Sequence, residues 1–444
     1  MLKRRIEIKL ESFKKGKKAL LIAGARQVGK SYIIRQFGKA NYSSFVEINL
    51  LTDTKAITIL KKATTTDEVL VSLSVLSKVP LKKGETLFFI DEVQELPDFL
   101  TFVKFLVEDG RYRFILSGSL LGVELKDIRS FPVGYMDIVQ MYPLSFEEFF
   151  IANGVQSEVL NYIQQCYEER KAVDESIHEK LMALIRLYLI IGGMPEAVQT
   201  YLDTKDLNRV LEVQQNILNL YKDDSAKQKY LNQIIETIPT ELNNKNQRFL
   251  SKDLSEKGRF SRYEESFNWL KDRGITLPSF MVRELSLPFE RKVNLFKLFF
   301  NDVGLLVALS PSFDIRYKIL TGDHGYEIEN AVAQELNTHG FNLYYYNSKK
   351  LGEVDFLLEY RSRLLPLEVK SGKDYKRHKA IDNLLFAHKE INEAIVLGDC
   401  NLLKEEGVLY LPLYMAMFLD YKNEAPSTSF IYEVDVSNLK VPKV

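Results

Sequence analysis

One stretch near the N-terminus places glycines, a lysine and a serine at the spacing that binds phosphate groups. It consists of Gly24, Ala25, Arg26, Gln27, Val28, Gly29, Lys30 and Ser31. In the pattern G-x-x-x-x-G-K-S, backbone N–H groups surround a polyphosphate and the lysine reaches its β- and γ-phosphates. The serine hydroxyl is a ligand for Mg²⁺. The stretch therefore predicts a nucleotide site with ATP and Mg²⁺ as cofactors.

The residues on either side of this stretch support the phosphate site. An apolar run at 19–23 precedes it, and an amphipathic pattern follows at 32–37. Phosphate loops join a buried strand to the N-terminus of a helix, where the helix dipole attracts anions. The alternative is a glycine-rich turn that carries a solvated lysine. Such a turn would not need a strand before it and a helix after it.

A second element needed beside such a loop is an acidic group at the end of another strand. The apolar residues 87–90 are followed directly by Asp91 and Glu92. Asp91 is predicted to hold the Mg²⁺ shell, and Glu92 to orient or deprotonate the attacking water. The alternative is a strand that ends in a solvated turn.

The strand predicted at 113–116 ends in Ser117, Gly118 and Ser119. A polar side chain at this strand end would lie between the two phosphate-binding elements. Ser117 is the candidate sensor of the γ-phosphate and Ser119 is the alternative. A plain turn at the strand end also fits these residues.

A second cluster of reactive residue types lies near the C-terminus. Asp355 and Glu368 stand on two successive predicted strands, and Lys370 follows two residues after Glu368. Side chains two apart share one face of a strand, and a hairpin turn near 360–363 brings Asp355 beside Glu368. Asp355 and Glu368 would ligate Mg²⁺, with Lys370 beside them, and position a water for attack on a phosphodiester.

Several of these motifs carry a family resemblance. Gly-Ala-Arg-Gln-Val-Gly-Lys-Ser, Ile-Asp-Glu-Val-Gln, Leu-Ser-Gly-Ser and, at 142–149, Tyr-Pro-Leu-Ser-Phe-Glu-Glu-Phe resemble bacterial and archaeal AAA+-class ATPases. The resemblance implies ATP binding and hydrolysis by a P-loop domain. It also implies that a helical region, a winged helix and a domain of unknown function follow.

The C-terminal cluster resembles the PD-(D/E)xK restriction-endonuclease-like fold. Glu329 fits the upstream acidic position of that fold. The alternative is a retained fold whose carboxylates are structural or bind a partner.

One position departs from the ATPase family. Such relatives often carry Gly-Arg shortly before the Pro-Leu-Ser-Phe stretch, where this chain has Gly134 and Tyr135. An arginine there acts on a phosphate or on the nucleotide of a neighbouring subunit. Arg129 is the nearest substitute. The departure favours, as an alternative function, a nucleotide switch with little turnover.

Composition restricts the class of protein. Of the 444 residues, 46% are hydrophobic and 27% charged, which excludes a largely disordered chain. Lys+Arg and Asp+Glu are both 60, so the chain as a whole is no polybasic nucleic-acid binder. Cys166 and Cys400 match no zinc or redox spacing and indicate unpaired thiols in a reducing compartment. The apolar stretch 295–309 is interrupted by polar residues, so the expectation is a cytoplasmic protein without a membrane span.

The alternation of apolar runs and amphipathic stretches predicts an α/β fold with a parallel N-terminal sheet. The first strands are expected at 19–23, 45–48, 87–90, 114–116 and 136–141. Residues 296–306 are expected to be strand-like. The chain is divided into a P-loop AAA+ ATPase core (1–150), a helical lid or connector (151–225), a winged-helix module (226–315) and an α/β restriction-endonuclease-like domain (316–444).

The leading functional hypothesis is a Mg²⁺-dependent ATPase that drives conformational change in its C-terminal domains. The alternatives are a nucleotide-gated binding or signalling switch and an ATP-regulated nuclease. ATP and ADP are the expected ligands, and DNA, a protein client or a second copy of the chain are candidate partners. Four basic residues with acidic neighbours are candidates for a DNA contact: Arg259, Arg262, Lys271 and Arg273.

Overall fold

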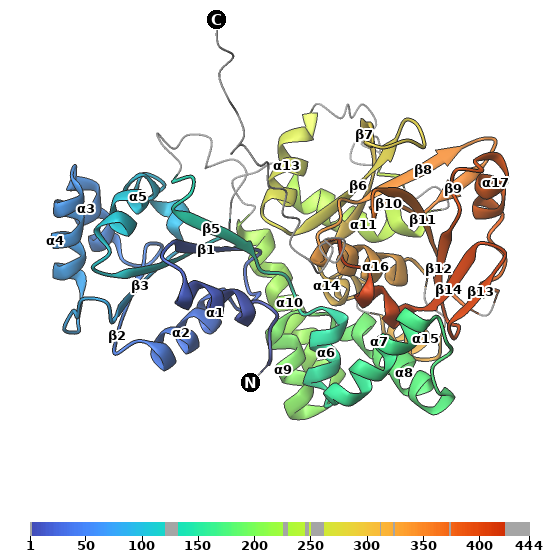
Figure 1. Cartoon of the computed structure of the whole chain (residues 1–444), viewed down its shortest axis with the longest axis horizontal. Helices are drawn as coiled ribbons and strands as arrows, with labels where there is room; N and C mark the ends of the chain where they lie inside the picture. Colours follow the sequence, from blue (N-terminus) through green and yellow to red (C-terminus); the bar gives the residue numbers. More distant parts are fainter. Residues whose placement is uncertain are drawn as a thin grey trace, which may run out of the picture.

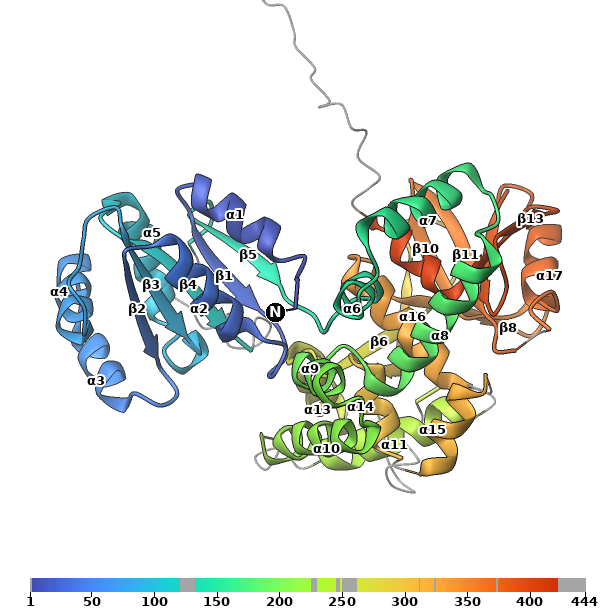
Figure 2. The same cartoon turned by 90° about the horizontal axis from the view of Figure 1, so that it is seen from below.

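The computed structural model describes residues 2–119, 132–224, 230–244, 248–249, 262–310, 312–322, 325–372 and 374–421. Figure 1 shows an N-terminal α/β lobe, coloured blue to cyan, beside a second lobe that contains the remaining described residues. The chain passes between the two lobes after the last strand of the first sheet, as the turned view in Figure 2 makes clear.

The first sheet is five-stranded and parallel, with the order β2-β3-β4-β1-β5. Its strands are β1 (Ala19–Ala23), β2 (Ser44–Asn49), β3 (Thr86–Asp91), β4 (Arg113–Gly118) and β5 (Met136–Gln140). The parallel sheet predicted for the N-terminal region is thus confirmed. Because ligands bind outside the carboxyl ends of parallel strands, the loops after β1, β3 and β4 share one functional edge.

Helices cover both faces of this sheet. They are α1 (Glu7–Lys15), α2 (Lys30–Asn41), α3 (Thr54–Lys62), α4 (Thr66–Leu76) and α5 (Phe99–Asp109). Side chains alternate along β3: Leu87 and Phe89 pack in the core that includes α1 and α2, whereas Phe88 and Ile90 pack in the core under α3–α5. Burial on both faces explains why the strand is apolar throughout.

A helical region follows, as predicted. It contains α6 (Phe146–Ala152), α7 (Ser157–Glu169), α8 (Glu175–Ile191), α9 (Pro195–Thr204) and α10 (Leu207–Asp224). Between α8 and α9 the chain turns at Gly192, whose φ is +72° and where an added Cβ would lie 2.2 Å from the Oδ1 atom of Asp302. Within the described part of the chain, no single helix has the length and apolarity of a membrane span, and α8 and α9, bent by 119°, reach them only as a pair.

The next segment combines helices with a four-stranded sheet of order β7-β6-β8-β9. Its elements are α11 (Leu231–Asn243), α13 (Glu264–Asp272), β6 (Thr276–Val282), β7 (Arg291–Phe300), α14 (Val303–Ala308), α15 (Phe313–Leu320), α16 (Tyr326–Thr338), β8 (Tyr344–Ser348) and β9 (Gly352–Val354). The parallel pairing of β6 with β8 joins strands from both sides of residue 315 in one sheet. The winged helix stays a prediction, since residues 250–261 lie outside the described ranges.

One sequence expectation in this segment is wrong. The apolar pattern predicts strand-like residues over 296–306, but β7 ends at Phe300 and α14 begins at Val303. The side chain of Asp302 caps this helix, because its Oδ1 accepts a hydrogen bond from the N–H of Leu305 at 2.9 Å. The cap therefore decides a conformation that the apolar pattern alone left ambiguous.

The last sheet has the order β10-β11-β12-β14-β13. Its elements are β10 (Phe356–Tyr360), β11 (Arg363–Val369), α17 (Lys379–Ala387), β12 (Ala394–Gly398), β13 (Leu403–Glu405), β14 (Val408–Pro412) and the following 3₁₀ helix η5 (Leu413–Phe418). β10 and β11 form an antiparallel hairpin in which Phe356 lies opposite Leu367. The hairpin therefore places Asp355, just before β10, next to the end of β11.

Candidate functional site

The loop between β1 and α2 has the backbone shape that its glycines predict. Gly24 has a φ of +146°, and a Cβ there would lie 2.2 Å from the carbonyl oxygen of Met141. Gly29, with a φ of +92°, precedes the first residue of α2. Lys30 is 6% exposed, and its Nζ donates to the carbonyl oxygens of Gly24 and Ala25, both at 2.8 Å. The lysine side chain thus links the end of the predicted phosphate loop to its beginning.

The remaining loop residues differ in exposure. Ala25 and Val28 are buried, whereas Gln27 is exposed and has a φ of +67°. The carbonyl oxygen of Arg26 accepts a hydrogen bond from the Tyr221 hydroxyl at 3.0 Å. Because Tyr221 belongs to α10, this bond attaches the phosphate loop to the helical region.

Asp91 joins the polar residues at the sheet edge. Its Oδ2 accepts hydrogen bonds from the Ser31 hydroxyl at 3.0 Å and from the Asn49 amide at 3.0 Å, and its Oδ1 accepts one from the Ser117 hydroxyl. The structure therefore brings together the residues proposed for the Mg²⁺ shell and the sensor. Hydroxyl and carboxylate oxygens are the donor set that Mg²⁺ prefers, so the residues present fit this ion. Asn49, which pairs in register with Asp91, was not among the residues predicted from the sequence.

Glu92 follows Asp91 in the left-handed backbone region, with φ 57° and ψ 50°. The side-chain amide of Gln94 donates a hydrogen bond to the Glu92 carboxylate.

The other predicted positions at this edge differ in what the structure shows. Among the described residues, Ser119 is buried and its hydroxyl has no hydrogen-bond partner. Arg129 lies outside the described residues. Tyr135 stands where the related ATPases often carry an arginine, and its hydroxyl donates to Glu108 on α5 at 2.7 Å.

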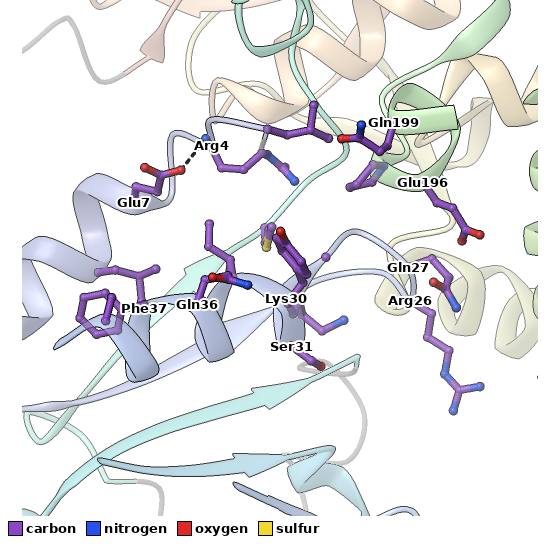
Figure 3. A pocket seen from close by; sticks show the side chains of 18 of the residues that line it. Arg4, Glu7, Arg26, Gln27, Lys30, Ser31, Gln36, Phe37, Glu196 and Gln199 are labelled. Carbon is purple, nitrogen blue, oxygen red and sulfur yellow. Dashed lines mark hydrogen bonds between the residues drawn. The ribbon is translucent and has the colours of Figure 1, made fainter. Parts of the chain in front are cut away.

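A cavity of about 1090 Å³ opens at this edge. In the view of Figure 3, Lys30 and Ser31, the first residues of α2, lie below the cavity, while Arg4 and Gln199 lie above it. Most of the lining comes from three parts of the chain: the phosphate loop with α2, the segment before and within α1, and α9 through Pro195, Glu196 and Gln199. Glu92 and Met141 also line the cavity. The contributions of α1 and α9 were not predicted from the sequence, since both helices lie outside the phosphate loop and α9 belongs to another region.

Burial lowers the pKa of Lys30 to about 8, although the charges of Glu92 and Asp91 raise it. A bound phosphate would raise this pKa, so nucleotide binding should take up a proton above pH 8. We expect nucleotide affinity to fall as the pH rises through about 8, approaching tenfold per pH unit well above it. Calorimetric titration with ADP at several pH values measures this dependence. In Lys30→Arg the side chain stays charged at every pH tested, so the ADP affinity of this variant should not fall above pH 8. If the affinity of the unmodified chain does not fall either, the role given to the Lys30 charge is wrong.

The C-terminal residues Asp355, Glu368 and Lys370 also come together. The Oδ2 atom of Asp355 accepts from the N–H of Val369 at 2.8 Å, and Lys370 donates to the Oε1 atom of Glu368 at 2.7 Å. All three, with Glu329, line a cavity of about 360 Å³. Burial and the neighbouring Asp355 charge raise the pKa of Glu368 to about 8.

A second lysine, Lys297, lies beside these carboxylates and was missed in the sequence. It is 0% exposed, and its Nζ lies 2.8 Å from Glu329, 2.9 Å from Glu353 and 3.7 Å from Asp355. In the sequence it counted only as an interruption of an apolar stretch. The available signal was a lysine within the apolar run 295–300, with Phe296 and Leu298 as neighbours.

Two of the basic residues considered for DNA contacts make local contacts, and Lys271 is exposed. Arg262 donates to the Tyr230 hydroxyl at 2.7 Å, and the Arg273 guanidinium lies 4.5 Å from the centre of the Trp269 ring. Arg259 lies outside the described residues. A DNA contact by this face stays a prediction.

Family models match three segments of the chain. Residues 16–150 match an AAA domain, 182–315 a domain of unknown function (DUF8612) and 324–414 another domain of unknown function (DUF4143). No curated protein matches the chain. The N-terminal segment is therefore an AAA-class P-loop ATPase domain, as its motifs predicted, whereas the restriction-endonuclease-like fold stays a prediction.

The solved structures that match this chain have low sequence identity to it. Thermotoga maritima RuvB is 15% identical, with 63% of this chain and 88% of that chain covered and a TM-score of 0.31. The Aeropyrum pernix ORC1 protein in complex with DNA is 11% identical, with 69% and 92% covered and a TM-score of 0.30. C. elegans PCH-2 is 11% identical, with 50% and 66% covered and a TM-score of 0.27. At such TM-scores the likeness carries no argument about what this chain acts on, and the assignment that the comparisons support is an AAA-class ATPase domain at residues 16–150.

Proposed function

We propose that the chain is a Mg²⁺-dependent ATPase whose nucleotide cycle moves its C-terminal domains. The observation that carries the proposal is the convergence of Lys30, Ser31, Asp91 and Glu92 at one sheet edge beside the 1090 Å³ cavity. Lys30 would neutralise the β- and γ-phosphates, and Ser31 and Asp91 would hold Mg²⁺. Glu92 would orient the attacking water, and Ser117 would report on the γ-phosphate through Asp91.

The cavity lining supports a link between nucleotide and movement. Its walls come from the phosphate loop on one side and from α9 on the other, so a nucleotide would contact both. A hydrogen bond connects the turn before α9 to α14. The N–H of Gly193 donates to Asp302 at 2.6 Å, and Asp302 caps α14. In this proposal residues 1–150 are the motor and residues 316–444 are the part that moves.

Steady-state release of phosphate from Mg²⁺-ATP tests the proposal. We expect many turnovers per subunit, dependence on Mg²⁺, and a loss of at least about 100-fold in Lys30→Ala, which lacks the cation for the phosphates. Lys39→Ala is the matched control, because Lys39 is exposed near the end of the same helix. One tightly held nucleotide without turnover would overturn the ATPase and support the nucleotide switch, which the Gly134–Tyr135 departure favours. A rate per subunit that rises with protein concentration would indicate a homo-oligomer.

A second candidate function is an ATP-regulated nuclease. The observation that favours it is the gathering of Asp355, Glu368 and Lys370 at the smaller cavity. Their chemistry suits Mg²⁺-assisted attack of water on a phosphodiester, in which Asp355 and Glu368 hold the ion. Nicking of DNA that requires Mg²⁺ or Mn²⁺ and disappears in Asp355→Ala would support this candidate.

A further inference from the structure

The C-terminal carboxylate cluster receives a cation from another segment of the chain. Lys297 is on β7, within the part that matches the first domain of unknown function. Its carboxylate neighbours Glu329, Glu353 and Asp355 are on or beside α16, β9 and β10, within the second such domain. Alternation along β7 directs Lys297 inward, so the lysine crosses from one matched segment into the acidic cluster of the next.

The Lys297 ammonium is held at close range. Its Nζ lies 2.8 Å from the Oε1 of Glu329, 2.9 Å from the Oε1 of Glu353 and 3.7 Å from the Oδ1 of Asp355. The Tyr345 ring centre lies 5.4 Å away. Burial lowers the pKa of Lys297, but the three carboxylates raise it by more, so the group stays charged. A buried ammonium is tolerated only with such paired charges around it.

Two further observations describe the electrostatics of the cluster. Glu368 is 7% exposed, and its Oε2 has no hydrogen-bond partner among the described residues, while its Oε1 accepts from Lys370. Within the same residues, no group of three or more His, Cys, Asp or Glu side chains has the geometry to hold a metal ion. The carboxylates thus surround an ammonium, whereas Mg²⁺ requires oxygen ligands at about 2.1 Å around one centre.

We propose that Lys297 is the built-in cation of this cluster: it holds Glu329, Glu353 and Asp355 at ammonium distances, and only without it can these carboxylates close around a divalent ion. The inference goes beyond the ATPase and does not depend on it. It also states a condition for the nuclease candidate: a tightly bound metal at Asp355 requires Lys297 to withdraw. Without withdrawal, the lysine ties the two matched segments together.

Manganese binding to the full-length protein, without nucleotide, tests the proposal. Electron paramagnetic resonance of free Mn²⁺ gives the number and affinity of bound ions. We expect Lys297→Met to gain one Mn²⁺ site that the unmodified chain lacks, or to bind it at least tenfold more tightly. Lys297→Arg should gain none, because its charge remains. Adding Asp355→Asn to Lys297→Met should remove the gained site.

A second variant covers the case in which Lys297→Met does not fold. Lys297→Met with Glu353→Gln has fewer unpaired charges and leaves Glu329 and Asp355 as ligands, so it should fold and still gain Mn²⁺ binding. Cooperative thermal unfolding, with a midpoint that Mn²⁺ raises only in the variants without Lys297, provides the second measurement. The proposal is overturned if the unmodified chain binds Mn²⁺ equally tightly at a site that Asp355→Asn removes. It is also overturned if folded variants without Lys297 gain no site.

Discussion

Replacing Glu92 with glutamine is expected to slow ATP hydrolysis by about 10²- to 10⁴-fold while nucleotide binding persists. Glutamine has nearly the same shape but cannot accept a proton from the attacking water. The carboxylate stands directly after Asp91, lines the cavity and receives a hydrogen bond from the Gln94 amide. A general base held in this way contributes to the chemical step and little to the affinity for the nucleotide.

Glu95→Gln is the matched control for this substitution. Glu95 is exposed in the same short turn, so the same chemical change there should leave hydrolysis unaltered. Single-turnover phosphate release measures the chemical step, and titration with a fluorescent ADP measures binding. If Glu92→Gln hydrolyses ATP at the unmodified rate, another group activates the water and the role assigned to Glu92 is wrong.

The phosphate loop could be predicted because its information is local. Eight consecutive residues determine the turn, and the glycines are needed where φ is positive or, at Gly24, where the backbone of Met141 lies within contact distance. The strand before it and the helix after it are also continuous patterns. The hairpin that brings Asp355 to Glu368 is predictable for a similar reason, since few residues separate its two strands.

The residues that the sequence did not reveal depend on pairing between distant elements. Asn49 reaches Asp91 only because β2 lies next to β3, and the residues of neither strand specify the order of strands in the sheet. Lys297 reaches Glu329 because α16 packs on β7. The helix that begins at Val303 shows a different limit: a short apolar run fits a strand or a buried helix equally well, and one capping aspartate decides.

Replacing Arg4 with methionine is expected to lower the free energy of unfolding by about 3–5 kcal/mol, the range for breaking a buried ion pair. Arg4 is 9% exposed and its Nε lies 3.1 Å from Glu148. Its other nitrogens donate to the carbonyl oxygens of Val28 at 3.1 Å and Tyr142 at 2.6 Å. Methionine keeps much of the side-chain volume but leaves the Glu148 carboxylate buried without its guanidinium.

Arg35→Met is the control, because Arg35 makes an equally good pair with Glu47 at the surface. Three hydrogen bonds of 2.6, 2.8 and 3.0 Å join them, yet the Arg35 side chain is 44% exposed. Solvent screens such a pair, so its loss should lower the free energy of unfolding by at most about 1 kcal/mol.

Urea unfolding followed by circular dichroism measures both variants. The first transition is compared, since a chain of several segments need not unfold in one step. Equal losses in the two variants would show that burial does not strengthen the Arg4 contacts. A larger loss in Arg4→Met, together with weaker nucleotide binding, would show that the N-terminal segment holds the phosphate loop through Val28.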